Sequence, residues 1–209
     1  MIIYPTASLV LELCVERAVW WAQHKTIFVA DLHLGRSSPV TPQDAAPILH
    51  SLARISALVE QHSATRVVFL GDMFHMKRNY NEYVLRIVAE WRQNLHGVKI
   101  ILVRGNHERV LGDPPPELHI DCVDPGYSEA GLTFLHEPRH SDHYSLCAHL
   151  HPNILVPSTR VAAEAVPCFV LGSSYLVLPA FDDLQPGRII RKMPDEAYAY
   201  IQNGQVVMQ

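Results

Sequence analysis

Hydrophobic and polar positions follow two successive patterns along the chain. In the first half, short uninterrupted apolar runs alternate with longer stretches that carry an apolar residue every three or four positions. The runs are typical of strands buried on both faces, and the longer stretches are typical of amphipathic helices, the first with Asp44 as a cap near its start. This alternation predicts right-handed crossovers and a sheet with a parallel core. The expected strands cover residues 26–30, 67–70 and 100–103, and the expected helices cover residues 44–62 and 81–95.

The second pattern begins after Gly112, where Asp113-Pro114-Pro115-Pro116 cannot continue a helix. From there on the segments are short and β-like, and Asn203-Gly204 is a strong hairpin signal. We interpret the break near Gly112 as a change of sheet inside one domain spanning residues 1–209. Including a hairpin near the N-terminus, the expected short strands cover residues 9–15, 18–21, 118–123, 132–135, 144–148, 168–171, 175–178, 197–201 and 206–208.

The composition is that of an ordinary soluble globular protein, with 209 residues, 48% hydrophobic and 18% charged. The formal net charge of −4 argues against nucleic-acid binding through bulk positive charge. It leaves room for an enzyme acting on a phosphodiester, because bound divalent cations add positive charge locally. The four cysteines form no CxxC pair, and the sequence shows neither a leader nor a membrane span, so we expect a cytoplasmic protein with reduced thiols.

Polar clusters stand where the apolar runs end. In an open α/β sheet, ligands bind outside the carboxyl ends of the strands, so these clusters are expected at one edge of the sheet. On an extended segment, an Asp-x-His or His-x-His pair points both side chains to the same side. The clusters are Asp31-Leu32-His33, Gly71-Asp72, Gly105-Asn106-His107-Glu108, His136 and His149-Leu150-His151.

The residue types in these clusters favour metal binding. Carboxylates, imidazoles and an amide oxygen suit Mn, Fe or Zn, and the absence of cysteine disfavours a structural zinc site. Seven donors are too many for one tetrahedral ion but suit two divalent ions that share a carboxylate. Two ions ~3.5–4 Å apart clamp the attacking and leaving oxygens of a displacement at phosphorus. The seven donors are Asp31, His33, Asp72, Asn106, His136, His149 and His151.

The order and spacing of these clusters resemble the five motifs of the calcineurin-like metallophosphoesterases. The resemblance implies an α/β fold, a four-layer α/β/β/α sandwich in which two mixed sheets pack together with helices outside. It also implies that His107 faces the phosphate and stabilises the transition state or protonates the leaving oxygen. It further implies a first metal held by Asp31, His33 and His151, a second held by Asn106, His136 and His149, and Asp72 as the bridge.

A closer similarity is to the bacterial PdeM-type phosphoesterases, which carry the label of ligase-associated DNA-damage-response endonucleases. It rests on segments such as Asp31-Leu32-His33-Leu34-Gly35 and Gly71-Asp72-x-Phe74-His75, and it becomes poor from Asp182 onward. Ala148 and Glu108 depart from the wider family, which usually has Gly and Asp there. The similarity implies a phosphodiesterase or nuclease acting on DNA, with a DNA ligase and a helicase as associates. We expect manganese as the metal, with iron or zinc as alternatives.

Other readings of the same residues remain open at this stage. His75 and Arg78 are candidates for binding substrate phosphate, although a solvated helix start explains them equally well. Arg104 fits a structural salt bridge better than a role in the site. A phosphomonoesterase or a cyclic-nucleotide phosphodiesterase would use the same donors. A non-catalytic scaffold of this fold would have lost some of them, and the complete set favours catalysis.

Overall fold

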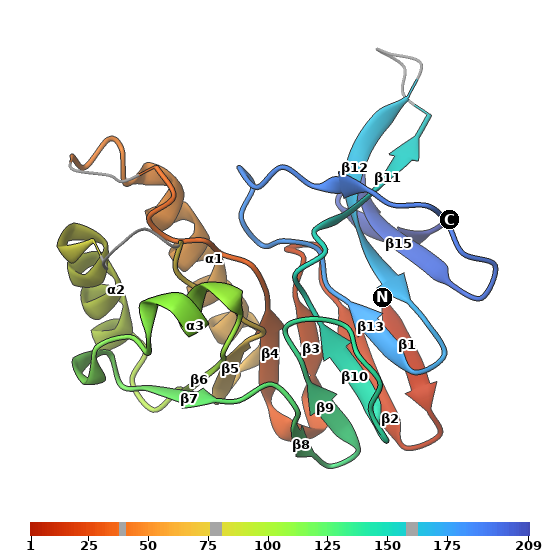
Figure 1. Ribbon diagram of the computed structural model, residues 1–209, viewed down its shortest axis with the longest axis horizontal. Helices are drawn as coiled ribbons and strands as arrows, with labels where there is room; N and C mark the ends of the chain where they lie inside the picture. Colours follow the sequence, from red (N-terminus) through yellow and green to blue (C-terminus); the bar gives the residue numbers. More distant parts are fainter. Residues whose placement is uncertain (38–40, 76–80, 158–162) are drawn as a thin grey trace.

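Two β-sheets pack face to face, and helices cover the outer face of the first sheet (Figure 1). The computed structural model describes residues 1–37, 41–75, 81–157 and 163–209. Both sheets contain parallel and antiparallel neighbours. The predicted α/β class with two mixed sheets is therefore confirmed.

The first sheet has seven strands that follow one another in sequence order. Its first four strands are antiparallel neighbours, and from the fourth strand onward the neighbours are parallel. The expected parallel core is thus present. The antiparallel strands before it include one strand, β1, that was not predicted from the sequence. The strands are β1 (Ile2–Thr6), β2 (Leu9–Leu13), β3 (Val19–Trp21), β4 (Thr26–Val29), β5 (Arg66–Phe69), β6 (Lys99–Val103) and β7 (Ile120–Val123).

The central strands are apolar throughout because both of their faces are buried. In β4, Ile27 and Val29 join the cluster under the helices, whereas Phe28 and the following Ala30 join the cluster between the sheets. β5 and β6 alternate in the same way. An uninterrupted apolar run is what a doubly covered strand requires.

The expected long helices are present as α1 (Ala46–His62) and α2 (Glu82–Asn94). Asn81 caps α2, because its side-chain oxygen accepts hydrogen bonds from the backbone N–H groups of residues 83 and 84. The prediction that Asp44 caps α1 is wrong, since its carboxylate accepts from the N–H and hydroxyl of Thr41 instead. None of the described helices is long and apolar enough to cross a membrane. The short helices are α3 (Asn106–Leu111), η1 (Ala22–His24) and η2 (Pro116–Leu118).

The second sheet has nine strands, of which β15 and β16 branch from β12. The hairpin predicted at Asn203-Gly204 is confirmed, with both residues at positive φ between β15 and β16. In spatial order the other strands are β14 (Arg188–Ile189), β11 (Pro152–Val156), β12 (Glu164–Leu171), β13 (Tyr175–Val177), β10 (Tyr144–Cys147), β9 (Leu132–Phe134) and β8 (Tyr127–Glu129), and the branch consists of β15 (Ala197–Gln202) and β16 (Gln205–Met208).

The chain changes sheet later than the proline run suggested. β7 follows that run and still pairs in parallel with β6, so the interpretation of a sheet change near Gly112 is wrong. α3 ends at Leu111, before the prolines, and η2 begins at Pro116. The chain then returns to the first sheet. The change takes place between β7 and β8, around Asp124 to Gly126.

Two apolar clusters fix the layers. The cluster between the sheets takes residues from both, such as Phe28 and Leu70 from the first and Phe134 and Leu146 from the second. A further cluster covers the other face of the second sheet. Within the described residues, it is built from strands and the segments beside them and includes no helical residue. The described α-helices therefore all belong to the side of the first sheet (Figure 1).

Candidate metal centre

The predicted donors meet at one edge, where the two packed sheets lie side by side. Asp31, Asp72 and Asn106 follow the parallel strands β4, β5 and β6 of the first sheet. His136 follows β9 of the second sheet, and the His149 segment follows β10. Parallel strands deliver the residues after their carboxyl ends to a common edge. The sheet packing then brings the histidines of the second half to the same place.

Asp31, His33 and His151 form a first group, whose donor atoms all lie within 4.8 Å of one another. Nε2 of His151 is 3.4 Å from Nε2 of His33 and 3.4 Å from Oδ1 of Asp31. Asp31 is fully buried, and its other oxygen accepts a hydrogen bond from the backbone N–H of His149 at 3.0 Å. Three donors thus converge on one point.

Asp72, His136 and His149 form a second group of the same tightness, with Asn106 beside it. Nε2 of His136 lies 3.0 Å from Oδ1 of Asn106, 3.1 Å from Nδ1 of His149 and 3.4 Å from Oδ1 of Asp72. Asp72 also contacts the first group, because its backbone carbonyl accepts a hydrogen bond from the N–H of His33 at 3.0 Å. Asp72 therefore acts on both groups.

Five of the donors stand on backbone in the left-handed region, which corrects the expectation of extended segments. Asp31, His33, Asp72, His149 and His151 have φ values of 54°, 47°, 51°, 69° and 44°. Side chains on such backbone do not alternate as they do on a strand, so the same-side argument for the two pairs fails here. Non-glycine residues in this region are uncommon and carry strain, which is typical of functional sites.

Two glycines make room for the donors. A Cβ on Gly71 would lie 2.2 Å from Nδ1 of His136, and a Cβ on Gly105 would lie 2.2 Å from Oδ1 of Asp72. Gly71 also has a φ of 87°. The sequence analysis recorded both glycines in the motifs without assigning them this role. Ala148, where glycine was expected, is not among the residues of positive φ, so this departure creates no strain.

Glu108 links two loops of the site, whereas from the sequence it was distinguished only as a departure from Asp. Its carboxylate is buried and accepts hydrogen bonds from the backbone N–H groups of Asp72 and Gly105, both at 2.9 Å, and of Phe74 at 3.4 Å. Burial, reinforced by the charge of Asp72, raises the pKa of Glu108 against these N–H groups. One carboxylate thus ties the loop after β5 to the loop after β6.

The described donors fit a cation on physical grounds. Oδ1 of Asp31 and Nδ1 of His33 are buried and have no hydrogen-bond partner among the described residues. Burial lowers the pKa of His33 to about 3, so its imidazole is neutral and able to donate a lone pair. For His136, burial opposes the shift, but Asp72 and Asp31 raise the pKa to about 9. Buried carboxylates in this arrangement require positive charge beside them.

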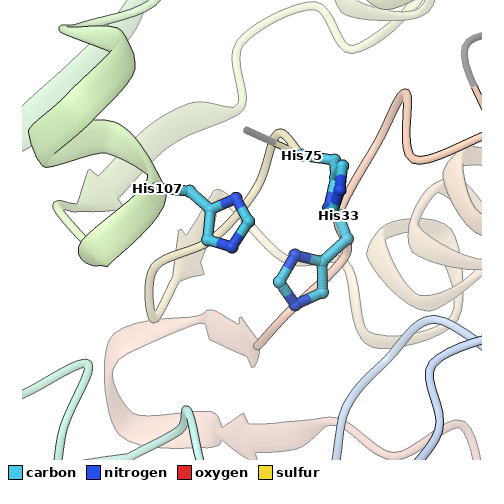
Figure 2. A group of neighbouring side chains, drawn as sticks. All are labelled: His33, His75 and His107. Atoms are coloured by element: carbon cyan, nitrogen blue, oxygen red, sulfur yellow. The ribbon is translucent and has the colours of Figure 1, made fainter. Parts of the chain in front are cut away.

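A third group combines His33 with His75 and His107, and sequence reasoning did not join these three (Figure 2). The ring centroids are 4.9 Å apart for His33 and His107, 5.1 Å for His75 and His107, and 5.7 Å for His33 and His75. Nε2 of His107 lies 3.7 Å from Oδ2 of Asp72. Burial lowers the pKa of His107. The three rings border one space next to the first group of donors.

Two arginines singled out in the sequence have different outcomes. Arg78 lies outside the described residues. Arg104 forms salt bridges with Asp113 at 2.7 Å and Asp124 at 3.0 Å, so the prediction of a structural salt bridge is confirmed.

Comparison with known proteins identifies the family. The family model described as calcineurin-like phosphoesterase matches residues 24–172, which is more than half of the chain. The chain belongs to the calcineurin-like phosphoesterase family. The protein is therefore a metallophosphoesterase, a hydrolase acting on phosphoester bonds. The expected membership and the expected class of enzyme are both confirmed.

Solved structures add detail within the calcineurin-like phosphoesterases. The crystal structure of Pseudomonas putida nuclease MPE matches with a TM-score of 0.84 and 28% identity, covering 100% of this chain and 99% of that one. This neighbour agrees with the expected likeness to PdeM-type endonucleases. YfcE, a phosphoesterase from E. coli, matches with a TM-score of 0.42 and 17% identity, covering 85% of this chain and 88% of that one. A search of curated proteins finds no match.

In this calcineurin-like phosphoesterase, the segment after Asp182 contacts the first group of donors at His151. The side-chain amide of Gln185 contacts Nδ1 of His151, and the backbone N–H of Arg188 donates to the carbonyl of His151 at 2.9 Å. The sequence analysis left this segment without a role. No motif marks it, because a single glutamine and a backbone hydrogen bond leave no pattern in a sequence.

Proposed function

We propose that the protein is a phosphodiesterase acting on DNA, that it uses two divalent cations, and that manganese is the physiological metal. The observation that carries the proposal is the assembly of two compact donor groups around Asp72 at the edge of the sheets. Two separate groups of three donors suit two cations and not one. Residues 1–209 would form one domain around this centre.

In this proposal, Asp31, His33 and His151 hold the first cation. Asn106, His136 and His149 hold the second, and Asp72 bridges the two. The buried Oδ1 of Asp31, which accepts no hydrogen bond from the described residues, and the convergence of Nε2 atoms from His33 and His151 support this assignment. When bound, two such cations lower the pKa of a water molecule toward ~7 and draw charge from the phosphoryl oxygens.

The remaining histidines act on the substrate. His107 lies on the first turn of α3, with Nε2 held near Asp72, and its partly exposed ring borders the space beside the donors. We assign it to stabilising the phosphoryl charge or giving a proton to the leaving oxygen, which a protonated imidazole can do. His75 borders the same space and is assigned to binding the phosphate. Arg78, outside the described residues, keeps the same proposed role.

Support for a diester substrate comes from the likeness to a nuclease over the full length of both chains. DNA, a role in repair, and a DNA ligase and a helicase as associates follow from the sequence similarity to PdeM-type proteins and are proposed on that basis. With a net charge of −4, the substrate phosphates must be met by cations and by local basic side chains.

The test is hydrolysis of bis(p-nitrophenyl) phosphate and of p-nitrophenyl phosphate by the purified protein. Each substrate is measured after chelation and with added Mn, Fe, Zn or Mg, for the wild type, Asp72→Asn, His107→Gln and His75→Ala. His119→Gln is the control, since His119 lies in the turn before β7, outside both donor groups. We expect Mn-dependent diester turnover that Asp72→Asn abolishes and His119→Gln retains.

Each other outcome points to a specific correction. Turnover of the monoester alone would identify a phosphomonoesterase and overturn the diester proposal. Turnover of cyclic nucleotides but not of labelled DNA would identify a cyclic-nucleotide phosphodiesterase and overturn the proposal that DNA is the substrate. A protein that binds no metal and hydrolyses neither ester would be a scaffold of this fold.

A further inference from the structure

A cavity of about 270 Å³ opens beside His33, away from the other donors. It lies between the loop after β4, the start of α1 and the segment after Asp182. Its walls are mainly apolar and include Leu34, Pro47 and Ile48. An apolar cavity next to a polar centre is the usual form of a site that receives the organic part of a ligand.

The outer wall of this cavity is Leu184, which is 63% exposed. Its backbone N–H donates to Oδ1 of Asp182 at 2.9 Å, which ties Leu184 to the cavity wall. Asp182 is itself buried at the cavity. An exposed leucine that lines a cavity offers apolar surface to a ring.

Arg36 lines the same cavity and carries the polar part of the argument. Its Nε is buried and, within the part of the chain that the structure describes, has no hydrogen-bond partner. The donor His33 lines the same cavity, which places Arg36 beside the centre. A desolvated N–H group without a partner is a donor that a ligand oxygen satisfies.

We propose that this cavity is a subsite for a nucleobase on one side of the substrate phosphate, and that Arg36 donates to a phosphoryl oxygen. The inference rests on the proposed phosphodiesterase function and names which residues recognise the substrate. The volume is below the roughly 300–1,000 Å³ of pockets for drug-sized ligands, so it suits a single base and not a longer segment. Recognition here would require an unpaired base, since a paired one is stacked inside a duplex.

The experiment measures inhibition of bis(p-nitrophenyl) phosphate hydrolysis by methyl phosphate, thymidine 5′-monophosphate and thymidine 3′-monophosphate. The proteins are the Mn-loaded wild type, Leu184→Ala, Arg36→Gln and Arg36→Lys. Leu155→Ala is the matched control, because Leu155 is 49% exposed on β11 and does not line the cavity. Arg86→Gln is the control for loss of an exposed arginine.

We expect at least one nucleotide to bind the wild type about tenfold more tightly than methyl phosphate, because the ring buries apolar surface. Leu184→Ala should remove most of this advantage and leave methyl phosphate unchanged. Arg36→Gln should weaken all three ligands alike, and Arg36→Lys should restore part of the loss. Both controls should behave as the wild type.

The subsite is wrong if neither nucleotide binds better than methyl phosphate, or if Leu184→Ala keeps the full advantage. The role of Arg36 is wrong if Arg36→Gln leaves methyl phosphate binding intact. A wild type that hydrolyses no diester would mean that the proposed function has failed. The same three ligands would then be titrated calorimetrically into the Mn-loaded protein, where the same ratios decide on the subsite independently.

Discussion

Gln185 contacts Nδ1 of His151, on the side of the ring opposite Nε2, which faces His33. Oε1 of the same amide is buried and has no hydrogen-bond partner among the described residues. The amide nitrogen faces Nδ1, and exchanging the two amide atoms by a 180° rotation would bring Oε1 there instead, where it would accept the Nδ1 proton of His151 and leave the Nε2 lone pair of His151 for a cation. The segment after Asp182 thus contacts one donor on the side of its ring that faces away from His33.

Gln185→Leu should therefore weaken binding at the first group of donors, by about 10–100-fold as for other outer-shell partners of metal ligands. Gln185→Glu keeps an acceptor and should lose much less. Calorimetric titration with Mn measures the effect, and Gln205→Leu on the exposed end of β16 is the control. Equal affinity in Gln185→Leu and the wild type would show that the contact has no role in binding.

Glu108→Ala should destabilise the fold even without metal. It leaves the buried N–H groups of Asp72 and Gly105 unpaired, at a cost of about 1–3 kcal/mol for each. Glu108→Gln retains an acceptor oxygen and should lie between the alanine variant and the wild type. Urea unfolding in the presence of a chelator gives the free energies. Glu117→Ala, at an exposed position, should change little, and an equal loss in both variants would contradict the argument.

Gly71→Ala and Gly97→Ala separate backbone strain from steric conflict. Both glycines have positive φ, at 87° and 73°, so each substitution costs about 1–2 kcal/mol of conformational energy. Only at Gly71 does the new Cβ meet a side chain, 2.2 Å from Nδ1 of His136, whereas nothing lies within 4 Å at Gly97. We expect Mn binding and turnover to be lost in Gly71→Ala alone. Retention of Mn affinity by Gly71→Ala would refute the steric role.

Removal of metal should lower the melting temperature, because Asp31 and Asp72 are buried together and Oδ1 of Asp31 lacks a partner. A ligand present at 100 times its Kd stabilises the folded state by about 2.7 kcal/mol. Scanning calorimetry with and without chelator measures the shift. In Asp31→Asn the shift should shrink or vanish, and an undiminished shift there would place the metal elsewhere.

The ion pair between Arg66 and Glu129 predicts a pH dependence outside the centre. Two hydrogen bonds from Arg66, at 2.7 and 3.1 Å, lower the pKa of Glu129, and partial burial opposes them. The pair should contribute about 1 kcal/mol or less. This contribution is complete above the unfolded-state pKa of about 4.3 and is lost as the pH falls through the lowered folded-state value.

Urea unfolding of the wild type and Glu129→Gln should therefore differ at pH 7 and converge in acid. Subtracting the two curves removes the contribution of all other carboxylates. A difference that grows as the pH falls would reverse the assigned sign.

The sequence was sufficient for the parallel core and for the donors, because both leave local patterns. Apolar runs marked β4, β5 and β6, and polar residues at their ends marked the edge at which Asp31 and Asp72 lie. It was not sufficient for β14, a two-residue strand that forms only against β11. Nor was it sufficient for the left-handed backbone of Asp31, which tertiary contacts impose against the local preference of the residue.

The third histidine group and the role of Glu108 were missed for a related reason. Neither depends on spacing in the sequence. His75 meets His107 because the loops after β5 and β6 run side by side. Glu108, which follows β6, accepts a hydrogen bond from Asp72 in the loop after β5. Such contacts can be found only once the strand order is known.

Each donor group draws on both sheets. Asp31 and His33 come from the first and His151 from the second, while Asp72 comes from the first and His136 and His149 from the second. Neither group exists until the two sheets have docked, which for the first group joins His33 to a residue 118 positions further along the chain, so hydrolytic activity would require the docked sheets. A nascent chain or a proteolytic fragment holding one sheet would be inert toward nucleic acid. Bound cations would in turn cross-link the two sheets, so that loss of metal and separation of the sheets would favour each other.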